Sequence, residues 1–261
     1  MLKQKNTESK PFTFKQFKIH QDRCAMKVGT DGVLLGAWAD VADAHTILDI
    51  GTGTGVIAIM LAQKTKDVST NNAITDEPKD TEGVVIHAVE IDDTAVEQAR
   101  ENMQDSPFAH RLTVFHDSIQ NFAKIHSHKY DLIVSNPPFF TGGTLSSNGD
   151  KTNVRHTVKL PHGDLLNSTR ELLHKNGRFC VILPLIEGLR FIEIARTYGF
   201  YLTHRTDIRP KQDKGIERLL LQFELSNHTY SHDELIIQNS RDERDYTEGY
   251  RELTKDFYTI F

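Results

Sequence analysis

A buried strand, a glycine-rich turn and an apolar helix follow one another between residues 46 and 63, and this order constrains the fold most. Thr46–Ile50 is rich in large apolar residues, Ile47, Leu48 and Ile50, which do not simply alternate with polar ones, as expected of a strand covered on both faces of a parallel sheet. Gly51–Gly55 then alternates glycine with threonine, and Val56–Gln63 is apolar enough to be a buried helix. Such a turn brings backbone N–H groups and a helix N-terminus toward a ligand. The sequence therefore predicts an α/β domain with a ligand site after this strand.

The glycine spacing distinguishes between two kinds of ligand. A dinucleotide fingerprint needs a glycine where this chain has Val56, which disfavours a dinucleotide oxidoreductase. Asp49-x-Gly51-x-Gly53-x-Gly55 instead resembles the S-adenosylmethionine (SAM) loop of class I methyltransferases. In that family the carboxylate lies near the amino-acid moiety of SAM, and the glycines admit its close approach. We expect SAM as cofactor, with a plain helix-starting turn as the alternative.

Two further strands are expected to end in acids. Glu90 closes the run 84–90 and is suited to accept the ribose hydroxyls of an adenosine-bearing cofactor, although an acid there can simply cap a helix. Asp117 lies at the end of the segment 112–118, where the third strand is expected and where class I methyltransferases commonly carry an acid that contacts the adenine amine of SAM. Its alternative is again a helix N-cap. The polar stretch 64–83 between these elements is interpreted as a surface insertion.

The fourth strand, 130–136, ends in Asn136-Pro137-Pro138-Phe139. Proline lacks an N–H and fixes φ, so the backbone after Asn136 should be stiff, with its carbonyls turned outward; a simple Pro-Pro turn is the alternative. A SAM loop followed by this motif resembles the amino-methyltransferases that alkylate a planar nitrogen. The resemblance implies that the Asn136 side-chain carbonyl and the Pro137 main-chain carbonyl hold the amine. Phe139 would stack on a flipped base.

The remaining elements complete one domain. The sequence predicts a helix that Asp31 caps, a helix over 92–103, a helix over 161–175, a strand over 177–183, a helix over 185–198 and an antiparallel pair over 200–206 and 219–223. These give a single doubly wound, mostly parallel seven-stranded sheet of the Rossmann-like class I methyltransferase type, with a short N-terminal extension. Residues 1–30 form a basic N-terminal arm, 31–261 form the methyltransferase domain, and 141–151 is expected to be a flap.

Charge is unevenly distributed along the chain. The net charge of −5 gives no global sign of a nucleic-acid partner, but residues 1–30 carry seven bases and two acids, a balance of 7 − 2 = +5. A second basic stretch runs over 205–218. Either stretch can be solvated surface or can bind RNA. The candidate RNA-binding residues are Lys15, Lys18, Arg23, Arg209, Lys211 and Lys214.

Aromatic residues alternate with polar ones in the arm, at Phe12, Phe14 and Phe17. This pattern predicts a short amphipathic strand or hairpin. The rings can stack on bases or pack on the domain, and the pattern alone favours packing.

The two ends of the chain carry a closer resemblance. Residues 23–38 and 246–258 are similar to the bacterial adenine-N6 methyltransferases that modify the adenosine 3′ to the anticodon of a valine tRNA. The similarity runs from about Phe12 to Tyr258, and the 64–83 stretch departs from it. It implies SAM-dependent N6-methylation with tRNA as partner. Many members carry tyrosine at the position of Phe139, so only stacking is expected of this ring. The segment beside the methionine end of SAM would comprise Lys27, Gly29, Thr30 and Asp31.

Several classes of protein are disfavoured. No apolar run reaches the length of a membrane span and the N-terminus lacks a signal-peptide core, so we expect a cytoplasmic protein with Cys24 and Cys180 reduced. The histidines show no metal-ligand spacing, and no protein partner is evident. An enzyme for rRNA guanine N2 or a release-factor glutamine, and a non-catalytic SAM-binding RNA-binding protein, remain as alternatives.

Overall fold

The computed structural model describes residues 10–24, 26–65, 83–138, 160–240 and 244–261. Most of the expected insertion, the expected 141–151 flap and Phe139 lie outside the described residues. None of the helices in these ranges is both long and apolar enough to cross a membrane.

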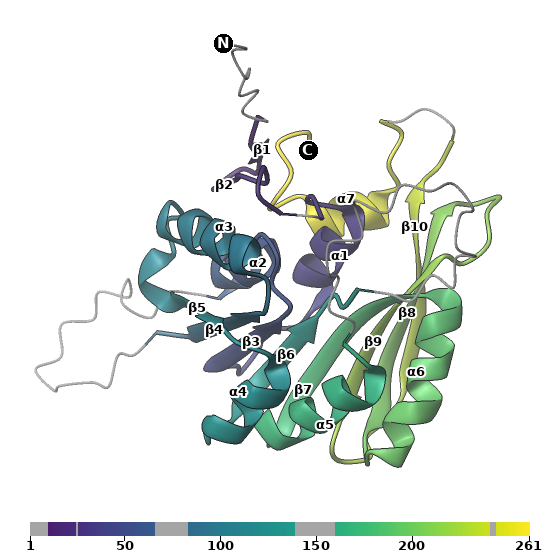
Figure 1. Cartoon of the computed structure of the whole chain (residues 1–261). Helices are drawn as coiled ribbons and strands as arrows, with labels where there is room; N and C mark the ends of the chain where they lie inside the picture. The colour runs from purple at the N-terminus through teal and green to yellow at the C-terminus, as the bar shows by residue number, and fades with distance from the viewer. Residues whose placement is uncertain (1–9, 25, 66–82, 139–159, 241–243) are drawn as a thin grey trace, which may run out of the picture.

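An eight-stranded, mostly parallel sheet forms the centre of the molecule (Figure 1). Its strand order is β10-β8-β9-β7-β6-β3-β4-β5, and only β9 runs antiparallel to its neighbours. This confirms the doubly wound α/β class and the antiparallel pair near the C-terminus. The strands are β3 (Thr46–Ile50), β4 (Val85–Glu90), β5 (Leu112–His116), β6 (Tyr130–Ser135), β7 (Leu173–Pro184), β8 (Tyr201–Lys211), β9 (Arg218–Glu224) and β10 (Ser231–Gln238).

Helices cover both faces of this sheet and enclose two apolar cores. One core lies under α1, α2, α3 and α7, and the other lies under α4, α5 and α6. Apolar residues on both faces explain why the central strands lack the alternating pattern of a half-exposed sheet. The helices are α1 (Thr30–Trp38), α2 (Val56–Lys64), α3 (Asp93–Gln104), α4 (Ile119–Ile125), α5 (His162–Leu172), α6 (Leu185–Thr197) and α7 (Glu248–Thr254), with a short 3₁₀ helix, η2, at Ala109–Arg111.

The prediction of seven strands was one strand short. The additional strand, β10, pairs in parallel with β8 at the edge of the sheet. Its first four residues are polar and exposed, so the apolar signal is confined to Leu235–Ile237 in its second half, which the sequence analysis did not assign to a strand.

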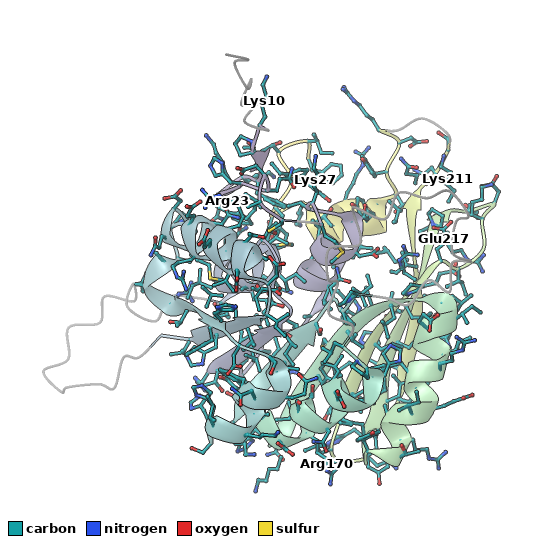
Figure 2. The ribbon with its side chains drawn as sticks, viewed as in Figure 1. Lys10, Arg23, Lys27, Arg170, Lys211 and Glu217 are labelled. Carbon is teal, nitrogen blue, oxygen red and sulfur yellow. The ribbon has the colours of Figure 1, made fainter. Side chains whose placement is uncertain are left out.

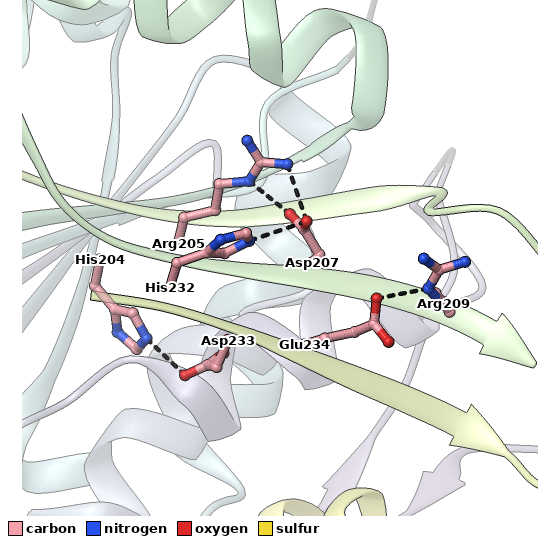
Figure 3. Close-up of polar contacts among 7 residues, drawn as sticks. All are labelled: His204, Arg205, Asp207, Arg209, His232, Asp233 and Glu234. Carbon is pink, nitrogen blue, oxygen red and sulfur yellow. Dashed lines mark hydrogen bonds and ion pairs between the residues drawn. The ribbon is translucent and has the colours of Figure 1, made fainter. Parts of the chain in front are cut away.

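Hydrogen bonds and an ion pair between side chains help to hold β10 on the sheet, as Figure 3 shows. His204 Nε2 lies 2.9 Å from Asp233 Oδ2, and Arg209 Nε lies 2.6 Å from Glu234 Oε2. His232 Nε2 lies 3.0 Å from Asp207 Oδ2. These polar contacts hold the exposed first half of β10, while Leu235 and Ile237 of its second half pack against the apolar core.

Two other element boundaries also differ from expectation. The helix expected over 161–175 ends at Leu172, and β7 begins at Leu173, because Leu173 is buried and pairs with Tyr130 of β6. Helix α1 begins at Thr30 with Gly29 as its N-cap, so the prediction of Asp31 as the cap was wrong. The Asp31 carboxylate instead accepts a hydrogen bond from Arg218 Nε at 2.8 Å.

The N-terminal arm packs against the C-terminal end of the chain. Strands β1 (Phe12–Thr13) and β2 (Lys18–Ile19) pair as an antiparallel hairpin, which confirms the expected hairpin. The Phe14 ring stacks on Phe17 at 4.6 Å and lies 6.0 Å from the Tyr258 ring. Phe14 and Phe17 are both buried, so these rings pack on the domain rather than offering faces to bases.

Lys64 closes the C-terminal end of α1. Its Nζ donates hydrogen bonds to the carbonyl oxygens of Ala37 and Ala39, each at 2.5 Å. Both alanines are buried, so these carbonyls depend on a partner within the protein.

We predict that Lys64→Met lowers the free energy of unfolding by about 1–3 kcal/mol, because it leaves buried acceptors unsatisfied. Urea unfolding followed by circular dichroism measures this change. Lys124→Met, on the exposed surface of α4, is the matched control and should change stability by less than about 0.5 kcal/mol. Equal effects of the two substitutions would contradict the capping role.

Candidate functional site

Two neighbouring strands deliver the central residues of the site to one place. In the parallel pair β3 and β6, Ile50 lies opposite Ser135, and the Ser135 hydroxyl donates a hydrogen bond of 2.9 Å to the Ile50 carbonyl. Gly51 and Asn136 therefore leave adjacent strands at the same level, at the carboxyl edge of the sheet, where open α/β folds bind ligands.

The glycine turn adopts a conformation that ordinary residues avoid. Gly51, Gly53 and Gly55 have φ values of 71°, 56° and 83°. A Cβ atom built on Gly51 or Gly53 would meet no atom within 4 Å, whereas one on Gly55 would lie 3.3 Å from Met103 Cε. Gly51 and Gly53 thus leave open space for a ligand, and Gly55 allows α3 to pack closely against the turn.

A cavity of about 470 Å³ lies in front of this turn. It is lined by the turn, by the loop before α1, by Asn136 and by residues from the ends of β8, β9 and β10. The predicted site residues that meet in its wall are Lys27, Gly29, Thr30, Asp31, Gly51, Gly53 and Asn136.

Glu90 and Asp117 lie outside the lining of this cavity, at the ends of the next two strands. Glu90 Oε2 accepts a hydrogen bond from the Gly53 N–H at 3.0 Å, so this carboxylate touches the glycine turn directly. The Asp117 N–H donates to the Glu90 carbonyl at 3.0 Å, which places the two acids side by side in the fold. Asp92 and Ser118 are the N-caps of α3 and α4, so neither acid takes the helix-cap role that was the alternative for it.

The Asn-Pro-Pro segment continues from β6 without further regular structure. Asn136 is half-buried, Pro137 is buried and Pro138 is half-buried. Because Phe139 lies outside the described residues, the structure places three of the four predicted catalytic residues.

Asp49 is a buried acid directly before the glycine turn. Its side chain is fully buried, and burial raises the pKa of its carboxyl group to about 7, while a 2.6 Å hydrogen bond from the Thr52 hydroxyl to Oδ2 opposes the rise. Oδ1 has no hydrogen-bond partner within the described residues. Asp49 does not line the cavity but lies behind the open glycine turn, and a cationic ligand in the cavity would favour the charged form of this acid and so lower its pKa.

Sequence analysis missed the opposite wall of the cavity. In this wall Arg218 donates a hydrogen bond to Asp31, and Glu217 lies beside Arg218 at the start of β9. Residues 31 and 218 are 187 positions apart, so no local pattern could reveal their contact. Three apolar residues complete the wall: Ile208, Pro210 and Ile237.

The candidate RNA-binding side chains differ in their surroundings. Arg23 pairs with Glu101 at 2.9 Å, Arg209 pairs with Glu234, and Lys15 Nζ donates to the Lys255 carbonyl at 2.6 Å. Lys18 and Lys214 are exposed and Lys211 is half-exposed, and none of the three forms an ion pair within the described residues.

The described ranges hold no group of three or more metal-ligating side chains that could bind an ion. Both cysteines are free, and Cys180 is buried.

Comparison with known proteins agrees with this geometry. The sequence family described as "Methyltransferase domain" matches residues 42–196. A predicted O-methyltransferase, Atu636 from Agrobacterium tumefaciens, superimposes with a TM-score of 0.63 at 17% identity, over 87% of this chain and 96% of that one. The glycopeptide N-methyltransferase MtfA, solved in complex with SAM, gives a TM-score of 0.52 at 11% identity, over 77% of this chain and 100% of that one. The fold and the site define a class I methyltransferase.

Two relatives of higher sequence identity indicate which family of class I methyltransferases this chain resembles. Proteins named tRNA1(Val) (adenine(37)-N6)-methyltransferase in Salmonella typhi and in Klebsiella pneumoniae subsp. pneumoniae are each 42% identical to this chain over 247 residues. In both cases the match covers 95% of this chain and 94% of the relative. The chain belongs to the family of tRNA1(Val) (adenine(37)-N6)-methyltransferases.

The raised pKa of Asp49 has a measurable consequence. The folded protein retains this proton up to about pH 7, while an unfolded Asp releases it near its ordinary pKa of 3.8. Folding therefore takes up a proton between these pH values, and the contribution of Asp49 to stability falls as pH rises through the window.

We predict that Asp49→Asn, which mimics the neutral acid, stabilises the cofactor-free protein more at pH 8 than at pH 5. The difference should be on the order of 2 kcal/mol, measured by urea unfolding at both pH values. Asp213→Asn, in an exposed turn, should show no such pH dependence. A stabilisation by Asp49→Asn that is independent of pH would mean that Asp49 is already ionised in the folded protein near pH 5.

Proposed function

We propose that this chain transfers the methyl group of SAM to the exocyclic N6 of adenine 37 in a valine tRNA. The names of its relatives support the substrate and the position. The observation that carries the proposal is the placement of Asn136 and the glycine turn in one cavity, since the donor of the methyl group and its acceptor must meet. The same proposal places the protein with its tRNA in the cytoplasm, with residues 1–30 as an arm on a single catalytic domain, 31–261.

The residues present fit SAM. Gly51 and Gly53 offer open space at positive φ, and the buried acid Asp49 lies directly behind the turn, where its field would favour a cation. Glu90 and Asp117, at the next two strand ends, would receive the ribose and the adenine amine. The segment lining the other side, Lys27 to Asp31, would lie along the methionine end. When bound, SAM supplies a methyl group on a positively charged sulfur.

Asn136 and Pro137 would act on the amine of the base. The lone pair of N6 is delocalised into the adenine ring, so the amine is a poor nucleophile until its N–H groups are held out of the conjugated geometry. The Asn136 side-chain carbonyl and the Pro137 main-chain carbonyl would accept one N–H each, and so direct the lone pair at the methyl group. No strong base is needed, because the nitrogen becomes acidic as the C–N bond forms and loses its proton to water. Pro138 would stiffen this backbone, and Phe139 would stack on the base.

We predict that Asn136→Ala retains SAM binding but lowers kcat by roughly 10²- to 10³-fold, because it removes one acceptor aimed at the amine. Calorimetry with SAM and turnover assays on tRNA separate the two effects. Asn176→Ala, an exposed asparagine at the start of β7, should change neither. A parallel loss of binding and turnover would identify Asn136 as a structural residue.

The identity of the product tests the proposal as a whole. We would incubate the enzyme with tRNA, rRNA and SAM that carries an isotopically labelled methyl group. Each RNA is then digested to nucleosides, and mass spectrometry identifies the nucleoside that carries the label. The label should appear in N6-methyladenosine of the tRNA fraction. Label in N2-methylguanosine of rRNA would reject adenine as the substrate in favour of guanine, and no label in either RNA would reject a nucleic-acid base as the acceptor.

The basic side chains around the cavity form the proposed tRNA surface. Figure 2 shows Lys10, Arg23 and Lys27 on one side of the upper edge and Lys211 on the other, while Arg170 lies at the opposite end of the molecule. Cations on both sides of a cavity can hold the phosphates that flank an extruded base. Lys18, Lys211 and Lys214, which form no ion pair with any other residue that the structure describes, are better suited to RNA than Arg209, which is half-buried against Glu234.

We predict that Lys18→Glu combined with Lys214→Glu weakens tRNA binding at least tenfold at low salt. The slope of the logarithm of the association constant against the logarithm of the salt concentration should become less negative by about 1–2. Filter binding over a range of KCl concentrations gives both values. The control, Lys124→Glu with Lys175→Glu, makes the same change in net charge on exposed residues away from the cavity. If both double variants bind alike, only net charge matters and the proposed surface is wrong.

A further inference from the structure

Asn102 joins two parts of the molecule that have different proposed ligands. It lies on α3 and its side chain is fully buried. Its Nδ2 donates to the Thr54 carbonyl, inside the glycine turn, and to the His20 carbonyl, in the arm, each at 2.8 Å. Its Oδ1 accepts from the His20 N–H, also at 2.8 Å. One amide thus holds the cofactor turn and the arm together.

A second amide on the same helix holds only the arm. Gln98 Oε1 accepts from the Arg23 N–H at 3.2 Å, and the Thr94 hydroxyl donates to the Arg23 carbonyl at 3.1 Å. Neither contact involves the glycine turn. α3 therefore offers a natural pair for comparison, Asn102 with both contacts and Gln98 with the arm contact alone.

The connection continues from His20 to the cavity wall. The next residue, Gln21, accepts a hydrogen bond from the Val28 N–H on its Oε1 at 2.8 Å. Val28 lines the cavity together with Lys27 and Gly29. The path Thr54, Asn102, His20, Gln21 and Val28 consequently starts and ends at the cavity, and its middle lies in the arm.

Both N–H groups of the Asn102 amide are occupied, one by each segment. If either the turn or the arm moves away, a fully buried donor loses its partner, and an unsatisfied buried donor is costly. Through this amide, the glycine turn in its observed position therefore stabilises the observed position of the arm, and the arm does the same for the turn. A ligand that fixes one of them lowers the free energy needed to fix the other.

We propose that Asn102 is a positioning residue that couples cofactor binding at the glycine turn to the placement of the tRNA-binding arm. SAM fixes the turn, the Thr54 carbonyl keeps Asn102 oriented, and the arm is held where it meets the tRNA. By reciprocity, tRNA bound to the arm strengthens cofactor binding by the same factor. This inference rests on the proposed function, since it assigns the turn to the cofactor and the arm to tRNA.

Hydrogen exchange of the wild-type chain tests the coupling without any substitution. S-Adenosylhomocysteine, the product of methyl transfer, is added in excess, and exchange is followed by mass spectrometry in peptides that cover 51–56 and 18–24. Protection should rise in both peptides. Protection of 51–56 with no change in 18–24 overturns the coupling while leaving the cofactor site intact. No protection of 51–56 overturns the proposed cofactor site itself.

Two variants then assign the effect to the amide. Asn102→Ala should abolish the cofactor-induced protection of 18–24 and raise KM for both SAM and tRNA, roughly three- to tenfold each. Gln98→Ala should raise KM for tRNA alone and keep the cofactor-induced protection. A merely structural Asn102 would lower the melting temperature but leave the protection of 18–24 and the two KM values unchanged in the folded protein. That result overturns the proposal.

Discussion

The hydrogen-bonded ladder between β3 and β6 aligns Ile50 with Ser135, and the site depends on this alignment. Because the strands are parallel, the residues that follow them emerge together, and Gly51 and Asn136 share a cavity wall. A slip of one residue would displace them by about 3.3 Å and turn each side chain of β6 to the other face of the sheet. The apolar residues buried on both faces of β6 oppose such a slip.

The central part of the fold and one half of the site could be predicted from local sequence. Apolar runs and a glycine turn are each recognisable within ten residues, and the structure has the strands and the turn where these patterns predict them, with Asn136 beside the turn in the cavity wall. The edge strand β10 was missed because its first half is polar and exposed and only the short run Leu235–Ile237 packs on the core, while polar pairs such as His204–Asp233 hold the rest. The far wall of the cavity was equally inaccessible, because Asp31 and Arg218 meet only once the sheet has formed.

The arm shows why charge alone is an incomplete guide to a binding surface. Its sequence carries an excess of bases, yet Arg23 is paired with Glu101 and its phenylalanines face the core. Lys18 remains available on the exposed face of the hairpin. Folding thus separates a basic stretch into cations that hold the arm and cations that can meet a partner.

The contact between the two chain ends also sets an order in time. The Lys15 N–H donates to the Phe257 carbonyl at 2.8 Å, and Phe14 lies in a bridge with Tyr258. During synthesis at about 5–20 residues per second, the arm waits on the order of 10–50 s for residues 257 and 258. The packing of the arm is therefore completed only after these distant residues have been made. A nascent chain on the ribosome, surrounded by tRNA, carries its basic arm without the support that holds it in place.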